Sequence, residues 1–377
     1  MELKRVATIT FITHFVTSGI ALAVPLALLE RGVSLVEIGM VLSILPMIFL
    51  TVRVVFAAIA DQIGWSPIFL LNSINLTLAT SIYLYAKSPL EFAIGKIFEG
   101  FSISAFWAVG RTATYALSPG REARESTKII ATASIGGALG GALTGFIMSI
   151  MGVNMAFTIL TITSIIQVYP TILLWKIGRN KSKLNLLKAL KALDPRGKEW
   201  NFWYISIIMA VNSLSRYPLF NLVLPVYMAK EINYSYMEIG FITMLYQLTS
   251  SITIYTTLKL PLSLTRAILQ SIIYFIACIS IPNFLNVLPI IMMIMAFADG
   301  LGARFYETII AKAVRNKRET ISIDIGILHV PMRIFESTAL IIFGFIVEIF
   351  GYEVVFIISG LAYILYSIQS YLESKER

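Results

Sequence analysis

The sequence predicts an all-α integral membrane protein with twelve transmembrane helices, arranged as two six-helix bundles related by a pseudo-two-fold axis. Three observations support this fold class. The 377 residues are 57% hydrophobic and 14% charged, with a mean hydropathy of +0.81, whereas soluble domains are about 25% charged. Basic residues gather in alternate loops, and a pattern of residues recurs after close to 200 positions.

Long apolar runs separated by short polar breaks define the helices. A run must hold roughly 20 apolar residues to cross a hydrocarbon core about 30 Å thick. Lipid leaves unpaired backbone amides without partners, so runs of this length indicate helices. The first run ends at Glu30-Arg31 without a small-residue cleavage site and is interpreted as a retained helix, not a signal peptide. The predicted helices cover residues 6–29, 36–58, 66–86, 91–116, 128–151, 154–176, 201–229, 237–258, 264–283, 286–311, 321–346 and 351–371.

The distribution of Lys and Arg predicts the orientation. The longest polar stretch, residues 177–200, contains seven basic residues and is predicted to be a basic cytoplasmic linker between bundles 1–176 and 201–377. Loops on the side of both termini hold 21 of the 30 basic residues, and the opposite loops hold only Arg31, Lys87 and Lys230. Loops rich in Lys and Arg face the cytoplasm, so both termini are predicted to be cytoplasmic. The protein itself is expected in the cytoplasmic membrane of a prokaryotic cell. The net charge of +9 belongs to these loops and does not indicate a nucleic-acid partner.

Internal repeats predict the two halves. Ser34-Leu-Val-Glu-Ile-Gly39 reappears as Ser235-Tyr-Met-Glu-Ile-Gly240, and residues 145–157 resemble residues 344–356. Glu99-Gly100 aligns with Asp299-Gly300, and Arg124-Glu-Ser aligns with Arg318-Glu-Thr. Duplicated bundles of this kind are typical of transporters, in which the substrate binds between the repeats near the membrane midplane.

Three local motifs are similar to those of the major facilitator superfamily (MFS). The loop after the second helix, residues 57–66, resembles the family pattern Gly-x-Leu-Ala-Asp-Arg-x-Gly-Arg-Lys and keeps Asp61 and Gly64. Lys96-x-x-x-Gly100 stands where the family often has Arg-x-x-x-Gly, and residues 136–145 resemble the glycine-rich motif of family antiporters. The resemblance implies the MFS fold and a monomeric secondary active transporter that moves a small organic solute by alternating access. It favours proton coupling and efflux by antiport, with Asp61, Gly64 and Arg111 in gating.

Charged residues inside the predicted helices mark the expected substrate and proton pathway. Such charges cost several kcal/mol unless they face water or a partner. The interiors of the third, sixth, ninth and twelfth helices contain none, and the resemblance implies that these four helices face lipid. Each pathway residue could instead be a satisfied ion pair or a packing residue. The predicted pathway residues are Lys96, Glu99, Arg216, Asp299, Arg304, Glu307, His329, Arg333, Glu336 and His14.

Other function classes receive less support. A single cysteine, Cys278, and two histidines without metal-ligand spacing predict no metal site, no cofactor and no catalytic centre. No Gly-x-x-x-x-Gly-Lys-Ser/Thr loop is present, so ATP-driven transport by this chain is not expected. The alternatives are a membrane-embedded enzyme and a non-transporting sensor on the same bundle. The substrate stays open among zwitterions, organic anions and amphipathic drug-like compounds.

Overall fold

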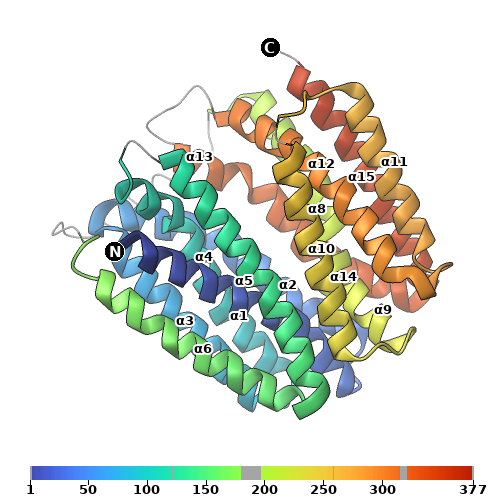
Figure 1. Ribbon diagram of the computed structural model, residues 1–377, viewed down its shortest axis with the longest axis horizontal. Helices are drawn as coiled ribbons and strands as arrows, with labels where there is room; N and C mark the ends of the chain where they lie inside the picture. The colour runs from blue at the N-terminus through green and yellow to red at the C-terminus, as the bar shows by residue number, and fades with distance from the viewer. Residues whose placement is uncertain (1, 120–121, 180–196, 258, 315–320, 376–377) are drawn as a thin grey trace.

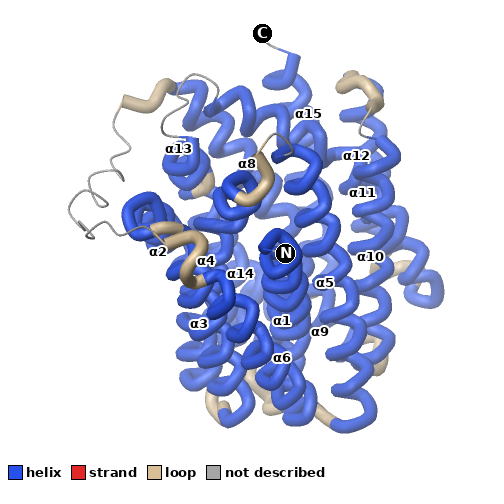
Figure 2. Tube along the Cα trace, turned by 60° about the vertical axis from the view of Figure 1, so that its left-hand side comes forward, coloured by secondary structure: helices blue, strands red, loops and turns tan. Residues whose placement is uncertain are grey.

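The computed structural model describes residues 2–119, 122–179, 197–257, 259–314 and 321–375, which form helices and short connections without a strand. Figure 1 shows long helices packed side by side, and Figure 2 shows the same bundle turned by 60°. The first group is α1 (Glu2–Glu30), α2 (Leu35–Ile63), α3 (Trp65–Tyr85), α4 (Pro89–Ala116), α5 (Glu122–Met151) and α6 (Val153–Leu174). The second group is α8 (Trp200–Pro218), η1 (Leu219–Val223), α9 (Leu224–Lys230), α10 (Tyr236–Thr257), α11 (Leu264–Ser280), η2 (Leu285–Val287), α12 (Leu288–Val314), α13 (Ile321–Leu328), α14 (Val330–Phe350) and α15 (Tyr352–Lys375).

The all-helical membrane architecture predicted from the sequence is confirmed. Among the described residues, ten helices are long and apolar enough to cross a bilayer. The runs α8–η1–α9 and α13–α14 each count as one of them. The helices α10 and α11 coincide with the predicted ranges 237–258 and 264–283 but fall outside that set. Most of the linker 177–200 and the Arg318-Glu-Thr motif lie outside the described residues, as does the side chain of Arg124.

Serine–glutamate capping boxes start several helices. Ser34 accepts a hydrogen bond from the Glu37 amide, and the Glu37 carboxylate accepts from the Ser34 amide, which satisfies amides that the first turn of α2 leaves free. Ser235 and Glu238 make the same contacts before α10. The repeated Ser-x-x-Glu-Ile-Gly sequence is therefore a helix start that occurs once in each group.

The two groups of helices share one packing scheme. In the first group, α1 packs on α5 and α6, α4 packs on α2 and α3, and α3 packs on α6. In the second group, α8 packs on α14 and α15, α12 packs on α10 and α11, and α11 packs on α15. The groups meet where α2 packs on α14 and where α5 packs on α10 (Figure 1).

Glycines bring the two groups into backbone contact at the end opposite the chain termini, called here the far end. A Cβ atom on Gly39 of α2 would lie 2.3 Å from the carbonyl oxygen of Leu340 in α14. A Cβ atom on Gly145 of α5 would lie 2.3 Å from the carbonyl oxygen of Tyr236 in α10. Gly344 and Gly240 approach the facing helix in the same way. These four glycines belong to the repeated sequence segments, so the contacts that join the groups use corresponding positions of the two repeats.

Side-chain hydrogen bonds also cross the groups at the far end. The Tyr236 hydroxyl donates to the Glu30 carboxylate at 2.5 Å, and the Glu348 carboxylate accepts from the Val36 amide at 3.2 Å. The end of the bundle where α1 begins and α15 ends is called here the terminal end. The far end is therefore closed by backbone packing and polar contacts together.

A buried ion pair lies within the first group. Lys96 Nζ and Glu99 Oε2 are 2.8 Å apart on α4, and each side chain is 3% exposed. The Tyr83 hydroxyl of α3 donates to the same carboxylate oxygen at 2.7 Å. The carboxylate is therefore satisfied by two donors from two helices.

We expect Gly39→Ala to lower the thermal unfolding midpoint by several degrees, because a new methyl group would overlap a backbone oxygen that cannot rotate away. Overpacking of this kind costs about 1–3 kcal/mol. Gly110→Ala is the matched control, since its Cβ would meet only the Phe106 ring at 3.8 Å. Equal midpoints for the two variants would contradict the proposed backbone contact.

We expect Lys96→Ala to destabilise the protein by about 3–5 kcal/mol, because Glu99 would remain buried without its cation. The control is Lys128→Ala, which breaks another 2.8 Å pair at the same spacing, with Glu125. Lys128 is 56% exposed, so its loss should cost below about 1 kcal/mol. Chemical unfolding would measure both, and the double variant Lys96→Met/Glu99→Leu should recover most of the loss.

Candidate functional site

A cavity of about 890 Å³ lies between the two groups of helices and is lined mainly by the second. The first group contributes Ser18, Ala21 and Leu22 from α1, Arg111 from α4, and Ile130 and Ser134 from α5. The lining includes Arg111, Ile130, Ile254 and Glu307, all in the terminal-end halves of their helices. The cavity therefore extends toward the terminal end, while the far end is closed.

A π-helical segment shapes one wall of the cavity. The run from α8 to α9 is interrupted by η1, directly after Pro218, whose ring removes a backbone donor. The wider turn of a π-helix displaces the side chains that follow it. Phe220 and Asn221 of η1, and Pro225 and Met228 of α9, all line the cavity.

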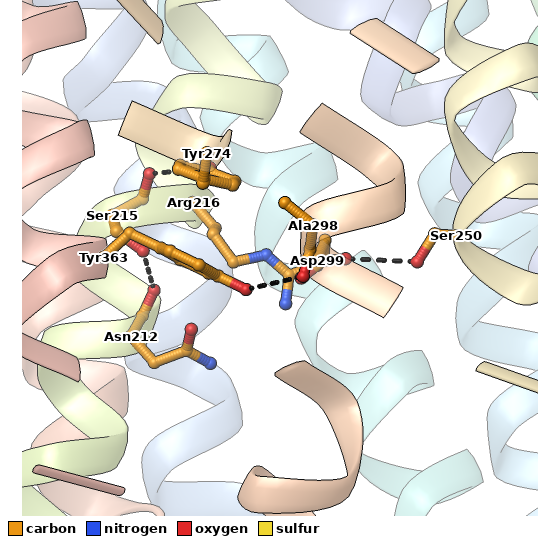
Figure 3. Close-up of polar contacts among 8 residues, drawn as sticks. All are labelled: Asn212, Ser215, Arg216, Ser250, Tyr274, Ala298, Asp299 and Tyr363. Carbon is orange, nitrogen blue, oxygen red and sulfur yellow. Dashed lines mark hydrogen bonds and ion pairs between the residues drawn. The ribbon is translucent and has the colours of Figure 1, made fainter. Parts of the chain in front are cut away.

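An ion pair between two helices forms the polar centre of the cavity (Figure 3). Arg216 Nη2 of α8 lies 2.7 Å from Asp299 Oδ2 of α12. The Ser250 hydroxyl of α10 donates to the same carboxylate oxygen at 3.2 Å. Asp299 is 7% exposed and Arg216 is 35% exposed, so the guanidinium is the more accessible partner.

Two stacked tyrosines hold the helices that carry this pair. The rings of Tyr274 and Tyr363 are 3.9 Å apart and nearly parallel. The Tyr363 hydroxyl donates to the carbonyl of Ala298 at 3.2 Å, and the Tyr274 hydroxyl donates to the carbonyl of Ser215 at 3.4 Å (Figure 3). Each bond ends on the residue directly before Asp299 or Arg216. The tyrosines therefore hold the backbone of α12 beside Asp299 and the backbone of α8 beside Arg216.

Some polar atoms at the cavity wall have no partner. Asn212 Oδ1 and Arg216 Nε are buried and make no hydrogen bond within the described part of the chain. Both residues line the cavity. A buried polar atom without a partner is costly, so one acceptor and one donor are available for a bound molecule.

A second acidic group lies beside the cavity on α14. Glu336 is buried, and its carboxylate accepts hydrogen bonds from the Ser213 hydroxyl and from Arg333, at 2.5 Å for the latter. The Arg333 guanidinium stacks over the Phe49 ring of α2 at 4.1 Å. His329 lies at the break between α13 and α14, where its Nδ1 is 2.6 Å from the Ile325 carbonyl oxygen. These residues are placed close together, as their helical spacing predicts, but they do not line the cavity.

The predicted gating residues lie near the terminal end. Arg111 is exposed and lines the cavity, and Asp61 is exposed near the end of α2. These two residues form no ion pair with each other in this structure, and a latch between them stays a prediction. Gly64 has φ of +94° between α2 and α3, a conformation that favours glycine.

The remaining predicted residues have varied surroundings. Glu307 is exposed and lines the cavity from α12, and the Arg304 guanidinium donates to the Leu260 carbonyl. Lys96 and Glu99 pair with each other outside the lining. His14 lies against the rings of Phe106 and Trp107, also outside the lining.

Several residues of the cavity are not among the predicted pathway residues. Ser250 contacts Asp299, and Tyr363 and Tyr366 line the wall from α15, a helix expected to face lipid. A helix without charges in its interior can still present hydroxyl groups to the cavity. The sequence signal for this is the three-residue spacing of Tyr363 and Tyr366, which places both on one face of α15. In the part of the chain that the structure describes, no group of three His, Cys, Asp or Glu side chains could hold a metal ion.

Comparisons with known proteins agree with this architecture. The family model of the Major Facilitator Superfamily matches residues 6–260. No curated protein matches the chain. The structure is similar to that of the nucleoside transporter NupG, with a TM-score of 0.75, 12% identity and full coverage of both chains. It is also similar to a bacterial homolog of the human lysosomal transporter Spinster, inward-facing and unoccupied, with a TM-score of 0.68, 13% identity and coverage of 99% and 96%. The chain belongs to the major facilitator superfamily and is a multi-pass membrane transporter, not an enzyme.

Proposed function

We propose that the chain is a secondary active transporter that binds a small organic solute beside the Arg216–Asp299 pair. The observation that carries this proposal is an interhelical ion pair with neighbouring unpartnered polar atoms, in a cavity of about 890 Å³. A ligand that supplies a donor to Asn212 Oδ1 and an acceptor to Arg216 Nε would complete the hydrogen bonding there. No cofactor is needed for this reaction.

The same ion pair suits proton coupling. A solute that binds the ionised Asp299 carboxylate in place of Arg216 would compete with a proton for that carboxylate, so each would lower the other's affinity. When a solute and a proton compete for the same carboxylate, exchange of the solute for the proton is favoured. We therefore propose proton-coupled antiport, with efflux as the direction. Glu336, buried beside the cavity, and Glu99 are further candidate proton sites on the predicted pathway.

The cavity lining indicates the chemistry of the solute. Its charged residues balance in number, since the cations Arg111 and Arg216 line it together with the anions Asp299 and Glu307. The walls also carry Tyr217, Phe220, Tyr246, Tyr306, Tyr363 and Tyr366. A net-neutral or zwitterionic molecule with a planar or apolar part and several hydrogen-bonding groups fits this lining. Because NupG is a nucleoside transporter of the same fold, nucleosides join zwitterions and amphipathic compounds in the first screen.

Alternating access would involve residues 1–176 and 201–377 moving as two bodies joined by the linker 177–200. The closed far end and the cavity reaching the terminal end correspond to one of the two access states. We assign the terminal end to the cytoplasm of a prokaryotic cell because 21 basic residues gather in its loops. The transporter would then act as a monomer in the cytoplasmic membrane, open to the inside.

The mouth of the cavity carries opposite charges on opposite groups of helices. Arg111 extends from α4 and Glu307 from α12, and both are exposed at the lining. We propose that they attract each other when the terminal end closes. Asp61 and Gly64 would support the same gate by holding the α2–α3 turn.

We expect Asp299→Asn to reduce pH-gradient-driven solute accumulation in proteoliposomes by at least about tenfold, because an amide cannot carry a proton between the two sides; a tenfold effect corresponds to about 1.4 kcal/mol. Exchange of solute at equilibrium should fall less. Labelled solute and internal pH would be followed together. Glu353→Gln is the control, since it removes an exposed carboxylate at the far end.

The same assay separates the candidate carboxylates. Glu99→Gln and Glu336→Gln should be compared with Asp299→Asn in one lipid preparation. If solute flux through the unmodified protein does not depend on the pH gradient, proton coupling is excluded. Unchanged accumulation in Asp299→Asn would remove Asp299 from the mechanism.

Charge reversal tests the proposed attraction between Arg111 and Glu307 at the mouth of the cavity. Arg111→Glu and Glu307→Arg should each slow transport by about tenfold, since like charges would then oppose closure across the mouth. The double variant should recover most of the rate, because the attraction is restored with its sign reversed. A double variant as slow as the singles would show that the two side chains do not meet.

A further inference from the structure

Both far-end contacts between the groups include the start of a helix. The second residue of α2, Val36, donates a hydrogen bond from its amide to the Glu348 carboxylate of α14 at 3.2 Å. The second residue of α10, Met237, donates from its amide to the Ser149 hydroxyl of α5 at 2.7 Å. Each helix start is therefore completed by a side chain of the other group. These two hydrogen bonds are called here the exchanged caps.

The exchanged caps use corresponding positions of the two repeats. Ser149 is the fifth residue of segment 145–157, and Glu348 is the fifth residue of the matching segment 344–356. Val36 and Met237 are each the third residue of the repeated Ser-x-x-Glu-Ile-Gly sequence. Donor and acceptor therefore recur together, with the roles of the two groups reversed.

A glycine one turn before each acceptor brings the helices close enough for the bond. A Cβ atom on Gly344 would lie 2.8 Å from the carbonyl oxygen of Leu35, and one on Gly145 would lie 2.3 Å from that of Tyr236. Leu35 and Tyr236 are the first residues of α2 and α10. In both contacts, one short segment thus sets the backbone distance and supplies the hydrogen-bond acceptor.

The amides of Val36 and Met237 depend on these acceptors. The first turn of a helix leaves its amides without partners inside the helix. The serine–glutamate boxes supply acceptors for the serine amide and the glutamate amide, which are other positions of the turn. A side-chain oxygen on a first-turn amide stabilises a helix, and a carboxylate there also interacts favourably with the helix dipole. The exchanged caps require the two groups to be in contact, so they stabilise only the access state in which the far end is closed.

We propose that Ser149 and Glu348 are gating residues, which cap the starts of α10 and α2 when the far end closes and release them when it opens. This inference rests on the alternating access proposed above. The far-end gate is then symmetric, since each group caps one helix of the other.

The test measures the separation of the groups at the far end by pulsed electron paramagnetic resonance in nanodiscs. Spin labels are attached at Lys87→Cys and Asn283→Cys, exposed sites in far-end loops of the first and second group, in a Cys278→Ala background. Ser149→Ala and Glu348→Ala should each raise the ratio of far-end-open to far-end-closed molecules by about fivefold, a typical effect of losing one helix cap. The double variant should raise the ratio by about 25-fold, because the two caps share no residue.

Two further variants separate gating from general damage. Glu348→Ser gives α14 the hydroxyl that α5 uses at the corresponding position, so it should remain closer to the unmodified protein than Glu348→Ala does. Glu353→Ala removes an exposed carboxylate from the first turn of α15 and should leave the distances unchanged. Distances in Ser149→Ala and Glu348→Ala that equal those of the unmodified protein would show that the exchanged caps are not a gate.

Gly145→Trp distinguishes this proposal from alternating access itself. An indole ring does not fit where a Cβ atom already meets the Tyr236 oxygen, so this variant should force the far end open. If Gly145→Trp lengthens the distance and the double alanine variant does not, the gate is wrong while alternating access stands. If Gly145→Trp also leaves the distance unchanged, the groups do not separate at the far end, and alternating access is contradicted together with the gate.

Discussion

Hydrocarbon supplies no counter-charge, so each charged side chain inside this bundle depends on a protein partner, on water or on a ligand. Lys96 is satisfied within its own helix by Glu99, and Arg333 by Glu336. Arg216 and Asp299 instead join two helices at the cavity wall. The first two pairs fix structure locally. The third is placed where a solute or a proton can replace one partner, which is what a transporter requires.

Close backbone contact is the second requirement of the architecture. Gly39 and Gly344 serve the contact between α2 and α14, while Gly145 and Gly240 serve that between α5 and α10. Helices in lipid gain little from apolar burial alone, so close approach and good packing hold them together. A contact made by glycines also has no side chains that must be disentangled when it opens. The same residues can therefore close the far end and let it separate.

The sequence predicts the helices well because the bilayer imposes a minimum apolar length on each span. It also predicts the Lys96–Glu99 pair, since three residues of helix place both side chains on one face. It does not predict that Arg216 meets Asp299, 83 residues later, because that contact depends on how α8 and α12 pack. Tyr363 is missed for a related reason, since its partner backbone lies on another helix.

The π-helical turn at η1 changes which residues of α9 face the cavity. A regular helix turns by about 100° per residue, so one additional residue in a turn rotates everything after it by that angle. If the regular helical period of α8 were continued through this run, a different face of α9 would point to the cavity. Loss of one residue within Leu219–Val223 would turn Pro225 and Met228 away from the cavity while leaving Arg216 in place. Insertions in a transmembrane helix can thus alter a binding surface without any substitution in it.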